Sequence, residues 1–253
     1  MKILAAIKQV PSRDSALKPD SSARWILEDN LTFEINEPDA YALEEALQLR
    51  EKHGGEVVAL CAGPERVSST IREALAKGAD RAIHLVTPNP NSYDSFALAS
   101  LLAHAIQPEQ PDLVLTGLQS DDYGYGQTGV ALAEILGMAH ASIVMQTEVQ
   151  SGAIRVKREL EDGWFQHVTL PLPAVLTIQS GINKLRYATL MGIKKARAKE
   201  VKQVEAPPPV PATAPVERIY APERSKQTIL IEGSPAEQAR KFVDTLKHEA
   251  RVL

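Results

Sequence analysis

The sequence predicts an α/β fold: a doubly wound, mostly parallel sheet with an antiparallel extension, followed by an extended C-terminal arm. Over residues 1–136, short apolar runs alternate with segments of helical spacing, which is the rhythm of a parallel sheet. Over residues 143–179 the apolar positions alternate instead, which favours antiparallel strands. Prolines then crowd residues 207–222 and indicate an extended linker. We therefore expect an α/β domain over residues 1–205 and a proline-rich linker with a helical arm over residues 206–253.

The first half of the chain is expected to contain four strands, each followed by a helix. The strands cover residues 2–10, 57–61, 81–86 and 113–116. Residues 12–34, after the first strand, are polar and irregular. The helices are expected from Asp39 to Gly54, through Ile71 to Gly78, over residues 96–106, and from Thr128 onward. Glycines end the first two helices, as is typical of helix C-termini.

The second half is expected to begin with four short antiparallel strands, over residues 143–149, 154–160, 164–170 and 174–179. Residues 181–205 are rich in Lys and Arg, which favours a solvated basic helix face. A last helix is expected to start at Ser234 and Pro235, with apolar positions along one side. Because such a helix has little local core beyond the linker, we expect it to dock on another chain.

Composition narrows the classes of function. The formal net charge of −4 argues against nucleic acid as the main partner. The single cysteine, Cys61, excludes an internal disulfide and fits a reducing compartment. The apolar run at residues 1–10 is too short for a signal peptide, and no stretch approaches the ~20 apolar residues that span a bilayer. We expect a soluble, cytoplasmic protein without direct membrane insertion.

Residues 113–136 are the stretch that points to a ligand. A buried strand, a glycine-punctuated loop and a helix follow one another, and this order favours an anion site. Glycines allow a phosphate to approach the backbone, and the helix start offers unpaired N–H groups. Thr128 is placed to act as the helix N-cap or as a phosphate ligand. On spacing alone, a glycine-rich surface loop without a ligand is equally expected, since the loop is neither a GxxxxGK[ST] nor a GxGxxG motif.

Other polar segments should gather at the same edge. In doubly wound sheets, ligands bind where the carboxyl ends of the strands open. The segment after the first strand, the residues before the Asp39 helix, the Ala62–Gly63 pair and the glycine loop would all lie there.

No catalytic constellation is found. The chain has neither a GxSxG nor an HExxH motif, and its histidines are dispersed. Asp121 and Asp122 could hold magnesium, but adjacent carboxylates in a glycine loop are more often solvated. Cys61 at a strand end is more often a small core residue than a nucleophile. A binding or carrier subunit without metal is therefore expected.

Several segments, taken in order, resemble one known family. They are ILAAIKQV, NEPDAYALEEAL, AGPE followed by TIREALAKGADRAIHL, DLVLTGLQ with GQTG, LPAVLTI, and RYATLMGIKKA. Together they make the whole chain similar to the beta subunit of electron transfer flavoprotein. The resemblance implies an adenine-nucleotide-hydrolase-like fold and a heterodimer with an alpha subunit that holds most of the FAD. It implies an electron carrier and not an enzyme, because the redox chemistry belongs to the flavin.

The resemblance also implies a nucleotide site. Ordinary beta subunits bury a structural AMP, and the matching positions here are Ala6, Asn36, Glu37, Pro38, Asp39, Ala62, Gly117, Leu118, Gln119, Ser120, Asp121, Asp122, Tyr123, Gly124, Tyr125, Gly126, Gln127 and Thr128. Beta subunits of electron-bifurcating flavoproteins instead bind a second FAD, which accepts hydride from NADH. Their loop resembles AIDGDTAQVGP, whereas this chain has SDDYGYGQTGV. The difference favours AMP and leaves the second FAD as the alternative.

The implied partners are flavin-dependent acyl-CoA or related dehydrogenases, as in fatty acid oxidation, and a quinone-linked oxidoreductase or a soluble acceptor. In the family, dehydrogenases recognise a loop that corresponds to Arg186, Tyr187, Ala188, Thr189, Leu190 and Met191. A leucine at the position of Leu190 enters an apolar pocket on the partner. From the residues alone, the alternative is that Leu190 packs into its own core.

Two hypotheses from other classes remain. A free-standing nucleotide-binding stress protein has a similar core but would not need the proline linker and terminal helix. A nucleotide-cleaving enzyme of this fold would typically carry an SGGxDS-type loop after the first strand, and residues 11–15 lack those glycines.

Overall fold

The computed structural model describes residues 1–87, 93–208, 210–222 and 228–252. Within it the chain divides into two compact units, Met1–Ile219 and Tyr220–Leu253, each of which is described by itself. None of the helices in these described ranges combines the length and the apolar character that a membrane crossing needs.

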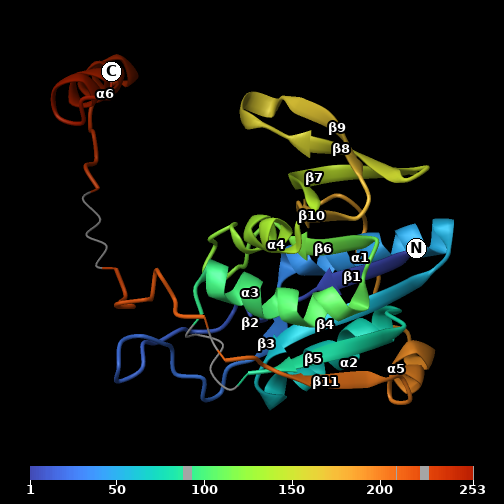
Figure 1. The fold of residues 1–253 in the computed structure, drawn as a ribbon. Helices are drawn as coiled ribbons and strands as arrows, with labels where there is room; N and C mark the ends of the chain where they lie inside the picture. The colour runs from blue at the N-terminus through green and yellow to red at the C-terminus, as the bar shows by residue number, and fades with distance from the viewer. Residues whose placement is uncertain (88–92, 209, 223–227, 253) are drawn as a thin grey trace. The chain divides into compact units, whose positions relative to one another are not determined.

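A sheet of nine strands, counted over the described residues, forms the centre of the first unit (Figure 1). Across the sheet the order is β11 (Val201–Glu205), β5 (Arg81–Val86), β4 (Glu56–Gly63), β1 (Lys2–Ala6), β6 (Leu113–Gly117), β10 (Ala174–Ile178), β7 (Ala139–Gln150), β8 (Ala153–Glu159) and β9 (Phe165–Pro171). Neighbouring strands run parallel from β11 to β7, whereas β8 pairs antiparallel with both β7 and β9. The predicted fold class is confirmed.

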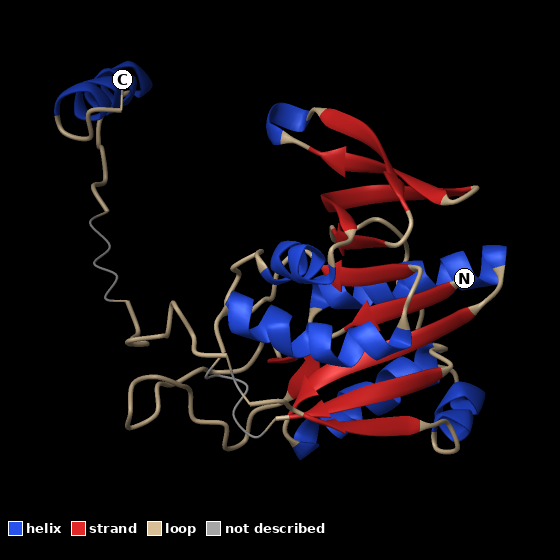
Figure 2. Ribbon diagram, in the orientation of Figure 1, coloured by secondary structure: helices blue, strands red, loops and turns tan. Residues whose placement is uncertain are grey.

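Helices cover both faces of the sheet (Figure 2). They are α1 (Glu37–His53), α2 (Ser68–Lys77), α3 (Ser95–Ile106), α4 (Thr128–Leu136) and α5 (Leu190–Ala196), with 3-10 turns at η1 (Glu65–Val67), η3 (Gln107–Glu109) and η4 (Glu161–Gly163). Successive side chains of β1 point to opposite faces, so Ile3 packs in one core with α1 and α2, and Leu4 packs in the other with α3 and α4. Cys61 is buried in the first of these cores.

The predicted first strand, residues 2–10, is wrong in its extent. It is two strands, because β1 leaves the sheet after Ala6 and β2 (Gln9–Pro11) pairs antiparallel with β3 (Phe33–Ile35). The break has a physical cause: the Lys8 N–H donates to the Asp39 carboxylate instead of to a neighbouring strand. Residues 12–34 are therefore not wholly irregular, since β3 begins inside them.

Two predictions for the second half also need correction. Residues 174–179 do not belong to the antiparallel extension: β10 is an inner parallel strand between β6 and β7, and all its residues are buried. Residues 181–205 are not one basic helix. They contain the short α5 and then β11, which runs parallel to β5 at the edge of the sheet.

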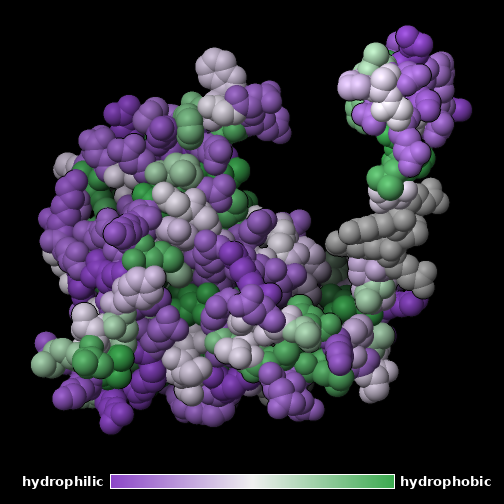
Figure 3. Space-filling model, turned by 180° about the vertical axis from the view of Figure 1, so that it is seen from behind, coloured by the Kyte–Doolittle hydropathy of each residue, from purple (hydrophilic) through white to green (hydrophobic). Residues whose placement is uncertain are grey.

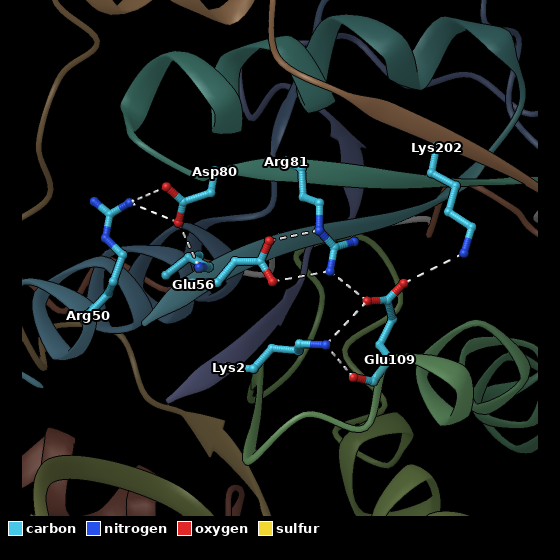
Figure 4. Close-up of polar contacts among 8 residues, drawn as sticks. Lys2, Arg50, Glu56, Asp80, Arg81, Glu109 and Lys202 are labelled. Atoms are coloured by element: carbon cyan, nitrogen blue, oxygen red, sulfur yellow. Dashed lines mark hydrogen bonds and ion pairs between the residues drawn. The ribbon is translucent and has the colours of Figure 1, made fainter. Parts of the chain in front are cut away.

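Charged side chains join the amino ends of the strands (Figure 4). Arg81 on β5 donates to Glu56 on β4 (Nε to Oε1, 2.8 Å) and to Glu109 of η3 (Nη2 to Oε2, 2.6 Å). Lys2 on β1 and Lys202 on β11 approach the same Glu109 carboxylate at 3.9 and 3.7 Å. This network lies at the edge of the sheet opposite to the carboxyl ends of the strands.

The second unit contains α6 (Pro235–His248). Its start has a capping box, in which the Ser234 backbone N–H donates to the Glu237 carboxylate. The Ser234 hydroxyl donates to the same carboxylate. Phe242 and Val243 on this helix are exposed. The preceding residues 206–219 belong to the first unit, where the backbone N–H groups of Thr213 and Ala214 donate to Asp94 at 2.6 and 3.0 Å.

Candidate functional site

A pocket opens at the carboxyl ends of β1, β4 and β6, between the start of α1 and the start of α4. It is lined by Ala6, Asn36, Asp39, Ala62, Gly117, Leu118, Gln119, Ser120, Asp122, Tyr123, Tyr125, Gly126, Gln127 and Thr128 among the residues expected to bind a nucleotide. Glu37, Pro38, Asp121 and Gly124 are expected site residues that do not line it. The first three lie just behind the wall: the Glu37 N–H donates to Asp121 Oδ2, and Pro38 packs near Gly117.

Gly117 allows α1 to begin directly against the end of β6. A Cβ at this position would lie 2.5 Å from Asp39 Oδ1 and 2.7 Å from the Asp39 backbone nitrogen. The Gly117 N–H donates to Asp39 Oδ1 at 2.7 Å, and the Lys8 N–H donates to Oδ2 at 2.8 Å. One carboxylate thus ties the ends of β1 and β6 to the first turn of α1.

Burial changes the pKa of the Asp39 carboxylate. It raises the pKa of Asp39 from 3.8 to about 6, although the N–H donors of Lys8 and Gly117 favour the charged form. Because the folded protein then holds a proton more tightly than the unfolded chain, the stability that protonated Asp39 contributes is complete below about pH 4 and is lost as the pH rises through about 6.

The start of α4 has the features of a phosphate site. Gln127 is the N-cap and Thr128 the first helical residue, so of the two roles expected for Thr128 the N-cap role is wrong and the phosphate-ligand role stays a prediction. No side chain caps this helix, and Gln127, Thr128 and Gly129 all line the pocket, which leaves the first-turn N–H groups available to an anion. A Cβ on Gly129 would lie 2.5 Å from Thr177 Cγ2, so this glycine lets the helix start close to the sheet.

The two aspartates of the glycine loop turn to different cations. Asp122 accepts from Lys8 Nζ at 2.6 Å, while Asp121 accepts from Arg13 Nη2 at 3.3 Å and from the Glu37 backbone. Across the described part of the chain, no group of three or more His, Cys, Asp or Glu side chains is placed to hold a metal ion. Ion pairs thus join the loop to Lys8, between β1 and β2, and to Arg13, after β2, and a backbone hydrogen bond joins it to the first residue of α1.

Aromatic side chains form a wall of the pocket, and the sequence analysis expected Tyr123 and Tyr125 there but missed Trp25 and Phe33. Tyr123 stacks on Tyr125 with ring centroids 5.4 Å apart, and Trp25 lies against Tyr123 at 5.8 Å. Arg66 lies over the Phe33 ring at 4.2 Å. The available signal was two aromatic residues, Trp25 and Phe33, in an otherwise polar segment. The Tyr123 hydroxyl is buried and has no hydrogen-bond partner among the described residues, and burial raises its pKa to about 12.

The rest of the lining includes further residues that the sequence analysis missed. Lys8, Gln9 and Thr116 follow or end the inner strands, and Thr87, Tyr93, Asp94, Ser95, Leu98 and Leu102 come from the end of β5 and from α3. Asp94 caps α3 by accepting from the Ala97 N–H, and this hydrogen bond and those from residues 213–214 lower its pKa to about 2.

The segment that leads into α5, together with the first turn of α5, lies outside this pocket. Leu190 is 83% exposed, Tyr187 is 92% exposed and Met191 is 60% exposed, and an apolar patch is visible over α5 at the lower left of Figure 3. Thr189 is the N-cap of α5, and its hydroxyl accepts from the Gly192 N–H at 3.0 Å. Arg186 instead points inward to α1. Ala188 is half-buried between them.

Comparison with known proteins identifies the family. The model of the electron transfer flavoprotein domain matches residues 24–209. The chain is 36% identical to the electron transfer flavoprotein subunit beta of Methylophilus methylotrophus, over 97% of this chain and 98% of the relative. It is 33% identical to the subunit beta of Bacillus subtilis (92% and 90% covered) and 33% identical to the mitochondrial subunit beta of Oryza sativa subsp. japonica (100% of both). The chain therefore belongs to the electron transfer flavoprotein family, in which it is a beta subunit.

Proposed function

We propose that the chain pairs with an alpha subunit and, as this heterodimer, carries electrons from flavin-dependent dehydrogenases to a quinone-linked oxidoreductase or a soluble acceptor. In this proposal it binds a structural AMP and completes the FAD site that the alpha subunit mainly holds. The observation that carries the proposal is the pocket at the carboxyl edge of the sheet, in a chain that matches beta subunits along its whole length.

The residues of the pocket fit AMP. Small and apolar side chains, among them Ala6, Ala62, Leu98 and Leu102, suit a flat base. The uncapped start of α4 offers N–H groups and a positive dipole end to a phosphate. The unpaired Tyr123 hydroxyl offers one more hydrogen-bonding group in the same wall. AMP has no redox chemistry, so its role here is structural.

The alternative occupant of the pocket is a second FAD. Which electron donor reduces the heterodimer distinguishes the AMP form from the form with two FAD molecules. We expect a purified acyl-CoA dehydrogenase with its acyl-CoA substrate to reduce the heterodimer, and NADH alone to leave the flavin oxidised. The measurement is flavin absorbance under anaerobic conditions, with each donor added separately. Rapid reduction by NADH would instead favour the bifurcating reading, in which the chain itself takes part in catalysis.

The same proposal gives the exposed apolar patch a role. We call residues 183–193 the docking loop. Leu190, Tyr187 and Met191 supply exposed apolar area, and a few such anchors usually carry most of the energy of an interface. The partner is a dehydrogenase with an apolar pocket for Leu190.

The C-terminal arm is proposed to dock on the alpha subunit. Its helix α6 exposes Phe242 and Val243, which a partner surface could bury at about 25 cal/mol per Å². Truncation after Pro222 should therefore weaken assembly of the heterodimer by several kcal/mol, of the order that burial of a few such side chains provides. Analytical ultracentrifugation against alpha would measure this. Unchanged affinity, with the sheet domain still folded by circular dichroism, would assign the arm another purpose.

A further inference from the structure

The docking loop is fastened to one face of α1. Arg186 donates through Nε to Glu44 Oε2 at 2.7 Å and through Nη1 to Glu51 Oε1 at 2.6 Å, while its Nη2 reaches both carboxylates at 3.0 and 3.2 Å. Asn183 Nδ2 donates to Glu45 Oε2 at 3.0 Å. Glu44 and Glu51 lie seven residues, or about two turns, apart on α1 and so share one face of that helix, while Glu45 directly follows Glu44.

The other end of the docking loop is fastened to α2. A Cβ on Gly192 would lie 2.3 Å from the Ala76 carbonyl oxygen, so α5 begins in close contact with the backbone of α2. The Thr189 hydroxyl and carbonyl accept from the N–H groups of Gly192 and Ile193 at 3.0 and 2.9 Å. Between the two fastenings, Tyr187 and Leu190 are left exposed.

The hydrogen bonds of Arg186 within the chain limit its ability to bind a partner. Its guanidinium makes four hydrogen bonds to two carboxylates, and the Glu44 carboxylate is buried. Bidentate pairs of this kind fix geometry as well as contribute energy. Four of the five N–H donors of Arg186 are thus taken by the two glutamates. A partner that competed for these donors would leave Glu44 buried without its counter-ion, which is costly.

We propose that Arg186, clasped by Glu44 and Glu51, is a positioning residue that holds the docking loop in the conformation a partner dehydrogenase binds, and that it does not contact the partner. The inference rests on the proposed docking function and replaces the direct contact that the family resemblance implied for Arg186. A preorganised loop loses less conformational freedom on binding. The contacts of Arg186 with Glu44 and Glu51 therefore affect the affinity for the dehydrogenase and not the rate of electron transfer within the complex.

The test uses the heterodimer with a medium-chain acyl-CoA dehydrogenase that octanoyl-CoA reduces. Arg186→Met should raise the apparent KM for the heterodimer about tenfold, the equivalent of about 1.4 kcal/mol, and leave kcat unchanged. Glu51→Gln should raise KM in the same direction. If Arg186 contacted the partner, Glu51→Gln would free its guanidinium and KM would fall or stay constant, which would overturn the inference. Lys52→Met, which removes a positive charge from the same helix, is the matched control and should leave KM unchanged.

Two further measurements separate this inference from the docking proposal. Hydrogen exchange in residues 187–196 should quicken about tenfold in Arg186→Met and not in Lys52→Met, because the amides of Gly192 and Ile193 lose their fixed acceptors. If hydrogen exchange in residues 187–196 is unchanged in Arg186→Met, the positioning role of Arg186 is overturned, whichever partner docks. If Arg186 acts only by positioning Leu190, its replacement matters little once Leu190 is gone. In a Leu190→Ala background, Arg186→Met should therefore raise KM by less than about twofold, and a full tenfold rise would indicate that Arg186 contacts the partner itself. If Leu190→Ala alone leaves KM unchanged, the docking function fails; if only Arg186→Met leaves it unchanged, the positioning role fails.

Discussion

Replacement of Gly117 by Ala is expected to lower the free energy of unfolding by about 3 kcal/mol or more and to deplete the pocket of nucleotide. The added Cβ would meet the Asp39 carboxylate and backbone at 2.5 and 2.7 Å, and neither can move without displacing the start of α1. The Asp39 carboxylate would also lose its hydrogen bond from the Gly117 N–H. Denaturant unfolding and nucleotide analysis of the purified variant measure the two effects.

Gly152→Ala is the control for this substitution. Gly152 lies in the turn between β7 and β8 with a φ of +69°, and beyond its chain neighbours no atom of the described residues lies within 4 Å of an added Cβ, so only the backbone conformation is strained. We expect a loss of about 1 kcal/mol there and no change in nucleotide. A loss at Gly117 as small as the loss at Gly152 would contradict the close approach of α1 to β6.

Leu190→Ala is expected to weaken the complex with a partner dehydrogenase by about 1–3 kcal/mol and to slow electron transfer at low concentration. The side chain is 83% exposed in the chain itself, so its truncation removes apolar area from the interface and not from the core. Titration of the heterodimer against the dehydrogenase measures the affinity. The melting temperature and the nucleotide content should stay nearly unchanged.

Leu160→Ala removes another exposed leucine, next to the turn between β8 and β9, and serves as the control. It should leave the affinity for the dehydrogenase unchanged. A marked fall in melting temperature for Leu190→Ala with normal affinity would mean that the side chain packs against its own domain, and docking would need another surface.

The buried helices and strands were predictable because their apolar residues recur with the period of the element that buries them. Strand β5 has the predicted bounds, and α1 buries the apolar positions Ala42, Leu43, Ala46 and Leu47 that predicted it. Strand β10 was assigned to the wrong partners, since a short apolar run does not reveal whether its neighbours are parallel. Strand β11 was missed because, as an edge strand, it carries lysine and glutamine among its few apolar residues.

Only those parts of the pocket that backbone groups form were predictable from the sequence. Glycines such as Gly117 and the start of α4 stand out in a sequence because they mark close approach and helix ends. The aromatic wall was not predictable in the same way. Trp25 reaches Tyr123 only because residues 12–34 fold back over the sheet edge, and the Lys8–Asp122 ion pair joins residues that are remote in sequence. Contacts of this kind follow from the tertiary fold and have no local pattern.

The nucleotide content of the purified heterodimer tests the central claim most directly. The complex is denatured, the released nucleotides are separated by chromatography, and each is quantified against the protein. We predict one FAD and one AMP per heterodimer, with the AMP lost in Gly117→Ala and retained in Leu190→Ala. Two FAD molecules and no AMP would contradict the account and place a second flavin in the pocket at the start of α4.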